Sequence, residues 1–321
     1  MLQTENYTII GIDGGGTNTR GAIFQNKQRV VEKKISSTAR VGAVGLGESC
    51  ERTLQMIIDL CNEAKIDVSE VDAVVVGLAG IWLDEEKRRA EGLLRTLART
   101  QNIQINELVV ISDAEIALEG ALNGEEGILL IAGTGSIALA RIGKTQLFRC
   151  GGWGIELDDE GSGAWIGREG LTALVRSLDG RGEKTKLLAK LKTDKIIGQY
   201  IDEKNPRIIV KAFNERKIEY SMITKPVMEC AADDDSICYN IIQNAKIHLL
   251  ELPNTLSKKF KSKKIKITLL GGIFENNTFL GNELKVELEK SPKFELIEHK
   301  GTALDGAYLI GEKIIKQTMD L

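Results

Sequence analysis

Short hydrophobic runs recur along the chain and are separated by turns rich in glycine. The β-prone run 7–12 ends at such a turn, and the runs 21–24 and 29–31 predict the next two strands of a hairpin sheet. Apolar residues at helical spacing predict a helix over 48–64, and the run 73–78 predicts a buried strand. The first part of the chain therefore reads as strand, tight loop, strand, followed by alternating helix and strand.

The hydrophobic pattern repeats this theme further along the chain. The run 108–111 predicts a strand, and the four residues after it match the S-x-x-E pattern that starts a helix. The run 127–132 leads into a second glycine-rich turn, and the run 265–270 leads into a third. The segment 185–251 reads as mostly helical.

Chain length and composition favour two lobes and small-molecule chemistry. At 321 residues, 42% of them hydrophobic, the chain is long for one domain and short for three. We expect an α/β protein with two lobes: residues 1–117 with 300–321 form the first, and residues 118–299, with a helical part, form the second. A formal net charge of -3 gives no field for holding nucleic acid or an anionic membrane, so neither partner is expected.

Cysteine usage and the N-terminus favour a cytoplasmic protein. The five cysteines contain no C-x-x-C pair, and their odd number does not suggest a disulfide framework. The first six residues are not a basic stretch followed by an apolar run, and no apolar window approaches the roughly 18 residues of a membrane span. With only two histidines, a histidine metal site is not expected.

The first glycine-rich turn is a candidate phosphate clamp. Consecutive glycines let backbone N–H groups turn toward a phosphate without Cβ clashes, and nearby hydroxyls add donors. The alternative is a tight turn selected only for its geometry. No G-K-[S/T] follows, and Thr19 stands where a dinucleotide-binding turn would need its third glycine. The candidate residues are Asp13, Gly14, Gly15, Gly16, Thr17, Asn18 and Thr19.

A second turn of the same kind strengthens the phosphate interpretation. Two such loops on two lobes could grip one polyphosphate from both sides. Asp13 would then serve Mg²⁺, directly or through water, because this ion prefers oxygen ligands; its alternative role is to cap the turn. The second loop consists of Gly133, Thr134, Gly135 and Ser136, and the third turn adds Gly271 and Gly272.

Asp113 follows a predicted strand and opens a predicted helix. Alone, Ser112 to Glu115 is more simply explained as a helix cap. The functional hypothesis makes Asp113 the carboxylate that accepts a proton from a substrate hydroxyl as it attacks the γ-phosphate of ATP.

The segment from Gly151 to Trp165 combines glycines, two tryptophans and four carboxylates. An aromatic ring beside carboxylates suits a polar ring substrate, because the ring covers the apolar face and carboxylates bind the hydroxyls. The alternative is an exposed acidic turn before a helix over 165–178.

With these motifs, the chain resembles the N-acetylglucosamine kinase and BadF/BadG-type ATPase family, in the superfamily of sugar kinases, Hsp70 and actin. The most specific part is Gly-Gly-Trp-Gly followed by Asp-Glu-Gly-Ser; residues 180–260 carry little of the resemblance. The matching segments are 11–19, 112–114, 132–136, 151–168 and 270–272.

The resemblance implies two ribonuclease H-like, actin-like lobes with ATP and Mg²⁺ in the cleft between them, and transfer of the γ-phosphate to an amino-sugar hydroxyl. It implies that Asp113 is the base, and that Thr134, Gly152, Trp153 and Asp159 contact the sugar. A homodimer is one possible assembly.

One departure from the family concerns the loop after the third strand. N-acetylglucosamine kinases place an Asn there to hold sugar hydroxyls, whereas this chain reads Ser-Ser-Thr-Ala-Arg over 36–40. The acceptor is therefore open among N-acetylglucosamine, glucosamine and other sugar-like alcohols.

The main rival hypothesis is a BadF-type activator, in which nucleotide hydrolysis drives a partner enzyme. Such activators hold an iron–sulfur cluster through cysteines, and Cys150 is the only cysteine near a motif in this chain. A sugar sensor without catalysis is a third possibility, and it would need neither Asp13 nor Asp113.

Overall fold

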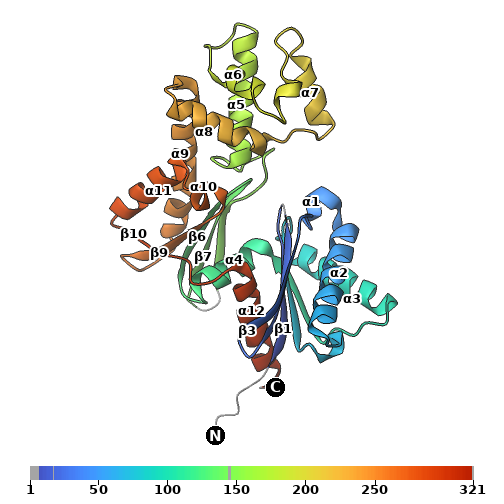
Figure 1. Ribbon diagram of the computed structural model, residues 1–321. Coiled ribbons are helices and arrows are strands. Elements are labelled where there is room, and N and C mark those ends of the chain that lie inside the picture. Colours follow the sequence, from blue (N-terminus) through green and yellow to red (C-terminus); the bar gives the residue numbers. More distant parts are fainter. Residues whose placement is uncertain (1–6, 17, 144–145, 320–321) are drawn as a thin grey trace. The chain divides into compact units, whose positions relative to one another are not determined.

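A computed structural model describes residues 7–16, 18–143 and 146–319 of the chain. These fold as two α/β units, drawn from Met1–Glu126 with Glu298–Leu321 (unit 1) and from Gly127–Ile297 (unit 2). Figure 1 shows the helices and strands of each unit.

Unit 1 is built on a five-stranded sheet in the order β3-β2-β1-β4-β5. β2 is antiparallel to its neighbours β1 and β3, whereas β1, β4 and β5 run parallel. The strands are β1 (Thr8–Gly14), β2 (Thr19–Gln25), β3 (Gln28–Ile35), β4 (Ala73–Leu78) and β5 (Glu107–Ser112). The helices are α1 (Val41–Val44), α2 (Leu46–Ala64), a 3-10 turn (Val68–Glu70), α3 (Asp84–Thr100), α4 (Asp113–Leu122) and α12 (Ala303–Met319).

Helices cover both faces of this sheet, so its central strands are hydrophobic on both sides. Ile10 and Ile12 of β1 pack into the core shared with α2 and α3, while Ile9 packs on the opposite side against residues of α12. Figure 1 shows α2 and α3 on one side of the sheet and α12 on the other. On that side α4 and α12 cross closely, because Gly120 and Gly306 have no side chains: a Cβ on either would overlap a backbone oxygen of the other helix or its flanking loop.

Unit 2 has a sheet with the same connections, in the order β8-β7-β6-β9-β10. β7 is antiparallel to β6 and β8, and β6, β9 and β10 are parallel. The strands are β6 (Gly127–Ala132), β7 (Ser136–Ile142), β8 (Gln146–Gly151), β9 (Ile265–Leu270) and β10 (Phe294–Leu296). The helices are α5 (Gly163–Leu178), α6 (Leu187–Lys192), α7 (Arg207–Asn214), α8 (Thr224–Ala232), α9 (Ser236–Ser257), α10 (Gly272–Glu275) and α11 (Phe279–Lys290), with 3-10 turns at Gly198–Tyr200 and Tyr220–Ile223.

The repeated strand order confirms the predicted pair of α/β lobes. In each unit, a glycine-rich loop connects the first antiparallel pair of strands, β1 to β2 and β6 to β7. The mainly helical segment 185–251 is also confirmed, because α6 to α9 occupy most of it. Within the described ranges, no helix is both long and apolar enough to span a membrane.

Candidate functional site

Asp13 lies near the carboxyl end of β1 and is only 6% exposed. Its cross-strand neighbour on β2 is Arg20, whose guanidinium donates a 2.9 Å hydrogen bond to the Asp13 carboxylate. Burial raises the pKa of Asp13 above its ordinary value, and the Arg20 charge offsets this only in part. Asp13 is therefore a buried carboxylate paired with Arg20, at the strand end where the phosphate loop begins.

Asp113 is the first residue of α4 and is half-buried. The helix cap is Ser112, whose hydroxyl accepts the Glu115 N–H at 3.2 Å, while the Glu115 carboxylate accepts the Ser112 N–H. The Asp113 carboxylate accepts a hydrogen bond from the N–H of Ala114 at 2.9 Å. Because Ser112 and Glu115 form the capping box, the cap does not account for Asp113.

The surroundings of Asp113 make it a stronger base than an ordinary Asp. Burial raises the pKa of Asp113 from 3.8 to about 6, and the negative charge of Asp13 adds to the shift. The Ala114 N–H and the positive charge of Arg40 oppose it. A carboxylate with a pKa near 6 is ionised at neutral pH and holds a proton more strongly than one in water.

Gly77 on β4 lets the start of α4 approach the sheet. It pairs in register with Asp13 on β1 and with Ile111 on β5. A Cβ atom at Gly77 would lie 2.3 Å from Cδ1 of Ile116 and 3.1 Å from Cα of Asp113. The absence of a side chain at Gly77 therefore sets the depth at which Asp113 sits.

Several residues of the first phosphate loop are packed or hydrogen-bonded within unit 1. Thr19 is fully buried, and its hydroxyl donates to the carbonyl of Ser37 at 2.9 Å. The carbonyl of Gly15 accepts a hydrogen bond from Thr38 Oγ1 at 3.0 Å. At Gly14, a Cβ would lie 2.7 Å from Leu78. Thr17 lies outside the described residues, and Asn18 is half-buried.

Neither the backbone conformation nor packing within the protein requires glycine at Gly16. Its φ is outside the left-handed region, and no described atom beyond its chain neighbours lies within 4 Å of a Cβ built there. Gly133 in unit 2 behaves similarly, since the nearest described atom to its Cβ position is the nitrogen of Gly272 at 3.9 Å. Both positions leave space through which a ligand could reach the backbone.

The second loop is fixed by hydrogen bonds to the start of α5. The N–H groups of Gly163 and Ala164 donate to the carbonyls of Gly133 and Thr134 at 2.8 and 3.1 Å. Ser136 is buried, and its hydroxyl donates to the carbonyl of Glu160 at 2.9 Å. The side chain of Thr134 is exposed at the tip of this loop.

Two further predicted residues pack against this loop. The Asp159 side chain is buried, with φ of 53°, and its Oδ2 would lie 2.8 Å from a Cβ on Gly135. Gly271 has φ of 101°, and a Cβ there would lie 2.5 Å from the carbonyl oxygen of Ala132. Asp159, Gly271 and Gly272 are therefore neighbours of the loop that contains Thr134.

The Gly-Gly-Trp-Gly turn is held by an arginine that sequence reasoning missed. Arg149 donates hydrogen bonds of 2.9 Å to the carbonyls of Gly151 and Gly152, and its guanidinium carbon lies 4.2 Å from the Trp153 ring centroid. Gly151, Gly152 and Gly154 have φ of 75°, 77° and 95°, which favour glycine. The Trp153 side chain remains 67% exposed, on a backbone that Arg149 fixes.

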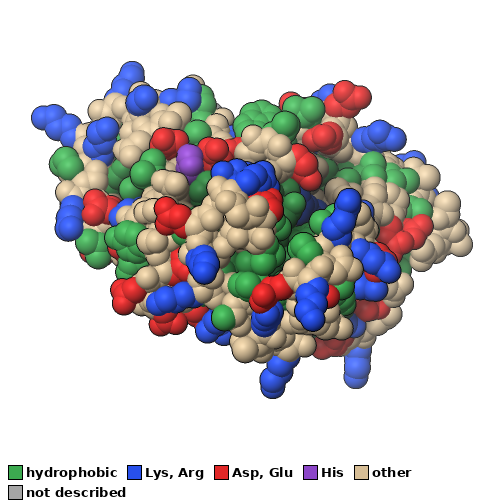
Figure 2. Space-filling model, turned by 90° about the horizontal axis from the view of Figure 1, so that it is seen from above, with side chains coloured by type: hydrophobic (Ala, Val, Ile, Leu, Met, Phe, Trp, Pro, Cys, Tyr) green, Lys and Arg blue, Asp and Glu red, His purple; other side chains and the backbone are tan. Residues whose placement is uncertain are grey.

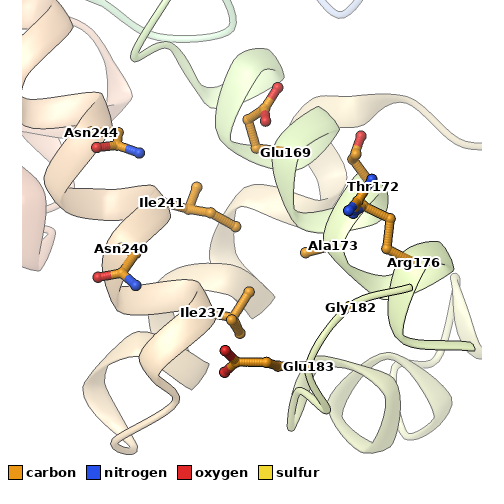
Figure 3. Close-up of a pocket in the computed structure, with 10 residues that line it drawn as sticks. All are labelled: Glu169, Thr172, Ala173, Arg176, Gly182, Glu183, Ile237, Asn240, Ile241 and Asn244. Atoms are coloured by element: carbon orange, nitrogen blue, oxygen red, sulfur yellow. The ribbon is translucent and has the colours of Figure 1, made fainter. Parts of the chain in front are cut away.

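Two other hollows lie apart from these residues. One, of about 290 Å³, lies between α5 and α9 in unit 2, with Glu169 and Arg176 on one helix and Asn240 and Asn244 on the other (Figure 3). Another, of about 480 Å³, surrounds the end of α3 in unit 1. Neither is lined by a predicted site residue.

The surface view shows basic and acidic side chains interspersed over the face that it presents (Figure 2). Among the described residues, no group of three or more His, Cys, Asp or Glu side chains is arranged to hold a metal ion. A single carboxylate such as Asp13 still fits Mg²⁺, because that ion keeps several waters and takes phosphate oxygens as ligands.

The two α/β units and their glycine-rich loops define a sugar kinase and actin-like type of fold, and residues 10–311 match the model of the BadF/BadG/BcrA/BcrD ATPase family. The chain belongs to this family.

Two curated relatives are named as kinases of amino sugars. The chain is 30% identical over 315 residues to an N-acetylmuramic acid/N-acetylglucosamine kinase of Clostridium acetobutylicum, covering 94% of this chain and 97% of that one. It is 25% identical over 318 residues to an N-acetyl-D-glucosamine kinase of Dictyostelium discoideum, with the same coverage. A crystal structure of a candidate N-acetylglucosamine kinase from Chromobacterium violaceum has the same fold, with a TM-score of 0.74, 23% identity and coverage of 95% and 98%.

Proposed function

We propose that this protein is an ATP-dependent kinase that transfers the γ-phosphate to a hydroxyl of an amino sugar of the N-acetylglucosamine or glucosamine type. The observation that carries the proposal is Asp113, a half-buried carboxylate at the carboxyl end of β5 whose pKa is raised to about 6. Family membership and the two relatives named as amino-sugar kinases support the choice of substrate class.

Asp113 acts as the general base. Its carboxylate accepts the proton of the sugar hydroxyl while the oxygen attacks the γ-phosphorus, and the bond to the ADP oxygen breaks. A base with a pKa near 6 stays ionised at neutral pH, so it is ready for each turnover. Gly77 positions Asp113 by letting α4 approach β4.

The nucleotide is held through the glycine-rich loops. Gly14, Gly15 and Gly16 offer backbone N–H groups in unit 1, and Gly135 and Gly272 do so in unit 2. The Gly133 N–H donates to the Gly135 carbonyl at 2.9 Å, so Gly133 contributes by leaving space for the phosphate. The space beside Gly16 and Gly133 supports this assignment, because no described atom of the protein closely approaches a Cβ built at either position. Asp13 holds Mg²⁺, directly or through water, and the ion when bound neutralises charge on the phosphates.

The sugar is recognised by residues of unit 2. Trp153 offers its exposed ring to the apolar face of the sugar, and Arg149 keeps the ring in place. Thr134, Gly152 and Asp159 supply hydrogen-bonding groups at the edge of the second loop.

The reaction needs ATP, so we place the protein in the cytoplasm.

The rival activator hypothesis rests on the family's ATPase name. Of the five cysteines, Cys50, Cys61, Cys230 and Cys238 are buried, and Cys150 is half-buried in β8. A kinase and an activator differ in one measurable respect, because only the kinase couples ADP release to consumption of a sugar.

The test is an ADP-release assay with N-acetylglucosamine, glucosamine, N-acetylmuramic acid, glucose and a control without sugar. The proposal predicts ADP release that depends on an amino sugar, with glucose a poorer acceptor. ADP release of equal rate without any sugar would contradict it and favour the activator.

A further inference from the structure

Hydrogen bonds fix the backbone of the loop between β3 and α1, residues 36–40. The Thr38 carbonyl accepts a 2.6 Å hydrogen bond from Arg52, and the Ala39 carbonyl accepts one of 2.6 Å from Ser49. The Thr38 hydroxyl donates to the carbonyl of Gly15 in the first phosphate loop at 3.0 Å. This loop is therefore a fixed neighbour of the first phosphate loop.

Arg40 ends this loop with a fixed backbone and a free side chain. Its N–H donates to Thr38 Oγ1 at 2.9 Å, and its carbonyl accepts the N–H groups of Ala43 and Val44 at 2.9 and 3.2 Å. The side chain is exposed, and among the described residues its guanidinium has no hydrogen bond or ion pair. Five donors thus stand unused on a rigid base.

The Arg40 side chain lies over the turn that follows β4. Its Cγ is 3.7 Å from the position that a Cβ on Gly80 would take, and Gly80 has φ of 89°. Val41, the first residue of α1, donates its N–H to the carbonyl of Ala79 at 2.9 Å. Since β4 lies between β1 and β5, this turn adjoins the strand ends that carry Asp13 and Asp113.

The charges in this region determine whether an acidic substrate can bind, and Arg40 supplies a positive charge there. Asp13 and Asp113 would repel an acidic substrate, and the positive charge of Arg40 is close enough to lower the pKa of Asp113. An arginine fork matches a carboxylate with two parallel hydrogen bonds. A neutral sugar would leave these donors in water, whereas a sugar with a carboxylate would use them.

We infer that Arg40 binds a carboxylate on the sugar, so that this kinase accepts an acidic amino sugar as well as a neutral one. The inference rests on the proposed kinase function and names a specificity residue for it. N-acetylmuramic acid is the appropriate probe, because it is N-acetylglucosamine with a lactyl ether that ends in a carboxylate. A relative with that sugar in its name is consistent with this choice.

The test compares wild type, Arg40→Gln and Arg40→Lys on N-acetylglucosamine, N-acetylmuramic acid and the uncharged lactyl amide of N-acetylmuramic acid. Rates are measured at pH 8, where Asp113 is ionised in each variant. For Arg40→Gln we expect kcat/KM on N-acetylmuramic acid to fall about 10- to 100-fold more than on the other two sugars. Arg40→Lys should retain part of the preference, because it keeps the charge and loses the fork. Arg89→Gln, an exposed arginine of α3, is the matched control and should leave all three rates unchanged.

Three outcomes would overturn the inference. Equal losses on all three sugars would place Arg40 on the transferred phosphate or on Asp113 instead. No loss on N-acetylmuramic acid would mean that Arg40 does not touch the carboxylate. A wild-type enzyme that phosphorylates N-acetylglucosamine but not N-acetylmuramic acid would refute the inference alone, while one that phosphorylates no sugar would refute the proposed function too.

Discussion

Replacing Asp113 by Asn removes the proposed base and leaves the shape of the side chain almost unchanged. The amide keeps the size of the side chain and, through its oxygen, can still accept the Ala114 N–H. It cannot take the proton of the attacking hydroxyl, so we expect kcat to fall about 10²- to 10⁴-fold. Binding of ATP and of the sugar should persist, because neither needs a proton acceptor.

The same substitution should stabilise the protein at neutral pH. The pKa of Asp113 is about 6 in the folded protein and 3.8 as the ordinary value, so its ionised form is disfavoured by folding. Between about pH 4 and pH 6 the unfolded chain loses this proton first, and the free energy of unfolding therefore falls as pH rises. Above pH 6 the full cost of burying the ionised carboxylate applies, at most about 3 kcal/mol for a pKa raised from 3.8 to about 6.

The assay combines initial rates with urea unfolding at pH 4.5 and pH 7.5. Asp113→Asn should unfold at higher urea than wild type at pH 7.5, with a smaller gain at pH 4.5. Asp84→Asn, at an exposed position in the first turn of α3, is the control and should show neither effect. Near-normal turnover would refute the role of Asp113 as base. If the gain in stability of Asp113→Asn over wild type were no larger at pH 7.5 than at pH 4.5, the electrostatic reasoning would be refuted.

Three further predictions concern the loops and β4. Gly16→Ala should raise KM for ATP and change stability by less than about 0.5 kcal/mol, since no described atom opposes the methyl group; an unchanged KM would contradict the clamp. Gly77→Ala should cost about 1–3 kcal/mol of unfolding free energy and lower kcat, because its Cβ meets Ile116; native stability with native kcat would contradict the packing argument. Trp153→Ala, assayed by titration of each ligand, should weaken sugar binding and leave ATP binding unchanged, and the reverse pattern would assign the turn to the nucleotide.

Much of the fold follows from local pattern. The runs 73–78 and 127–132 coincide with β4 and β6, because strands buried on both faces are continuous hydrophobic stretches. The helix start after β5 was also predictable, since Ser112 and Glu115 form the expected capping box. Glycine-rich turns after apolar runs indicated both hairpin loops.

Other parts of the site depend on contacts that no local pattern encodes. Gly77 looks like an ordinary strand residue, and the need for glycine appears only when Ile116 of α4 is placed against it. Arg149 lies in β8, and its role follows from the turn geometry of the glycines after it. No hydrogen bond or ion pair to the Arg40 guanidinium is found in the part of the chain that the structure describes, and sequence spacing does not reveal this.

Transfer of phosphate to an amino sugar can be followed by the label of [γ-³²P]ATP in a single turnover. With N-acetylglucosamine present, we expect the label to appear in a sugar phosphate, in equal amount to the ADP formed. Label found only in inorganic phosphate, at a rate that the sugar does not change, would contradict it.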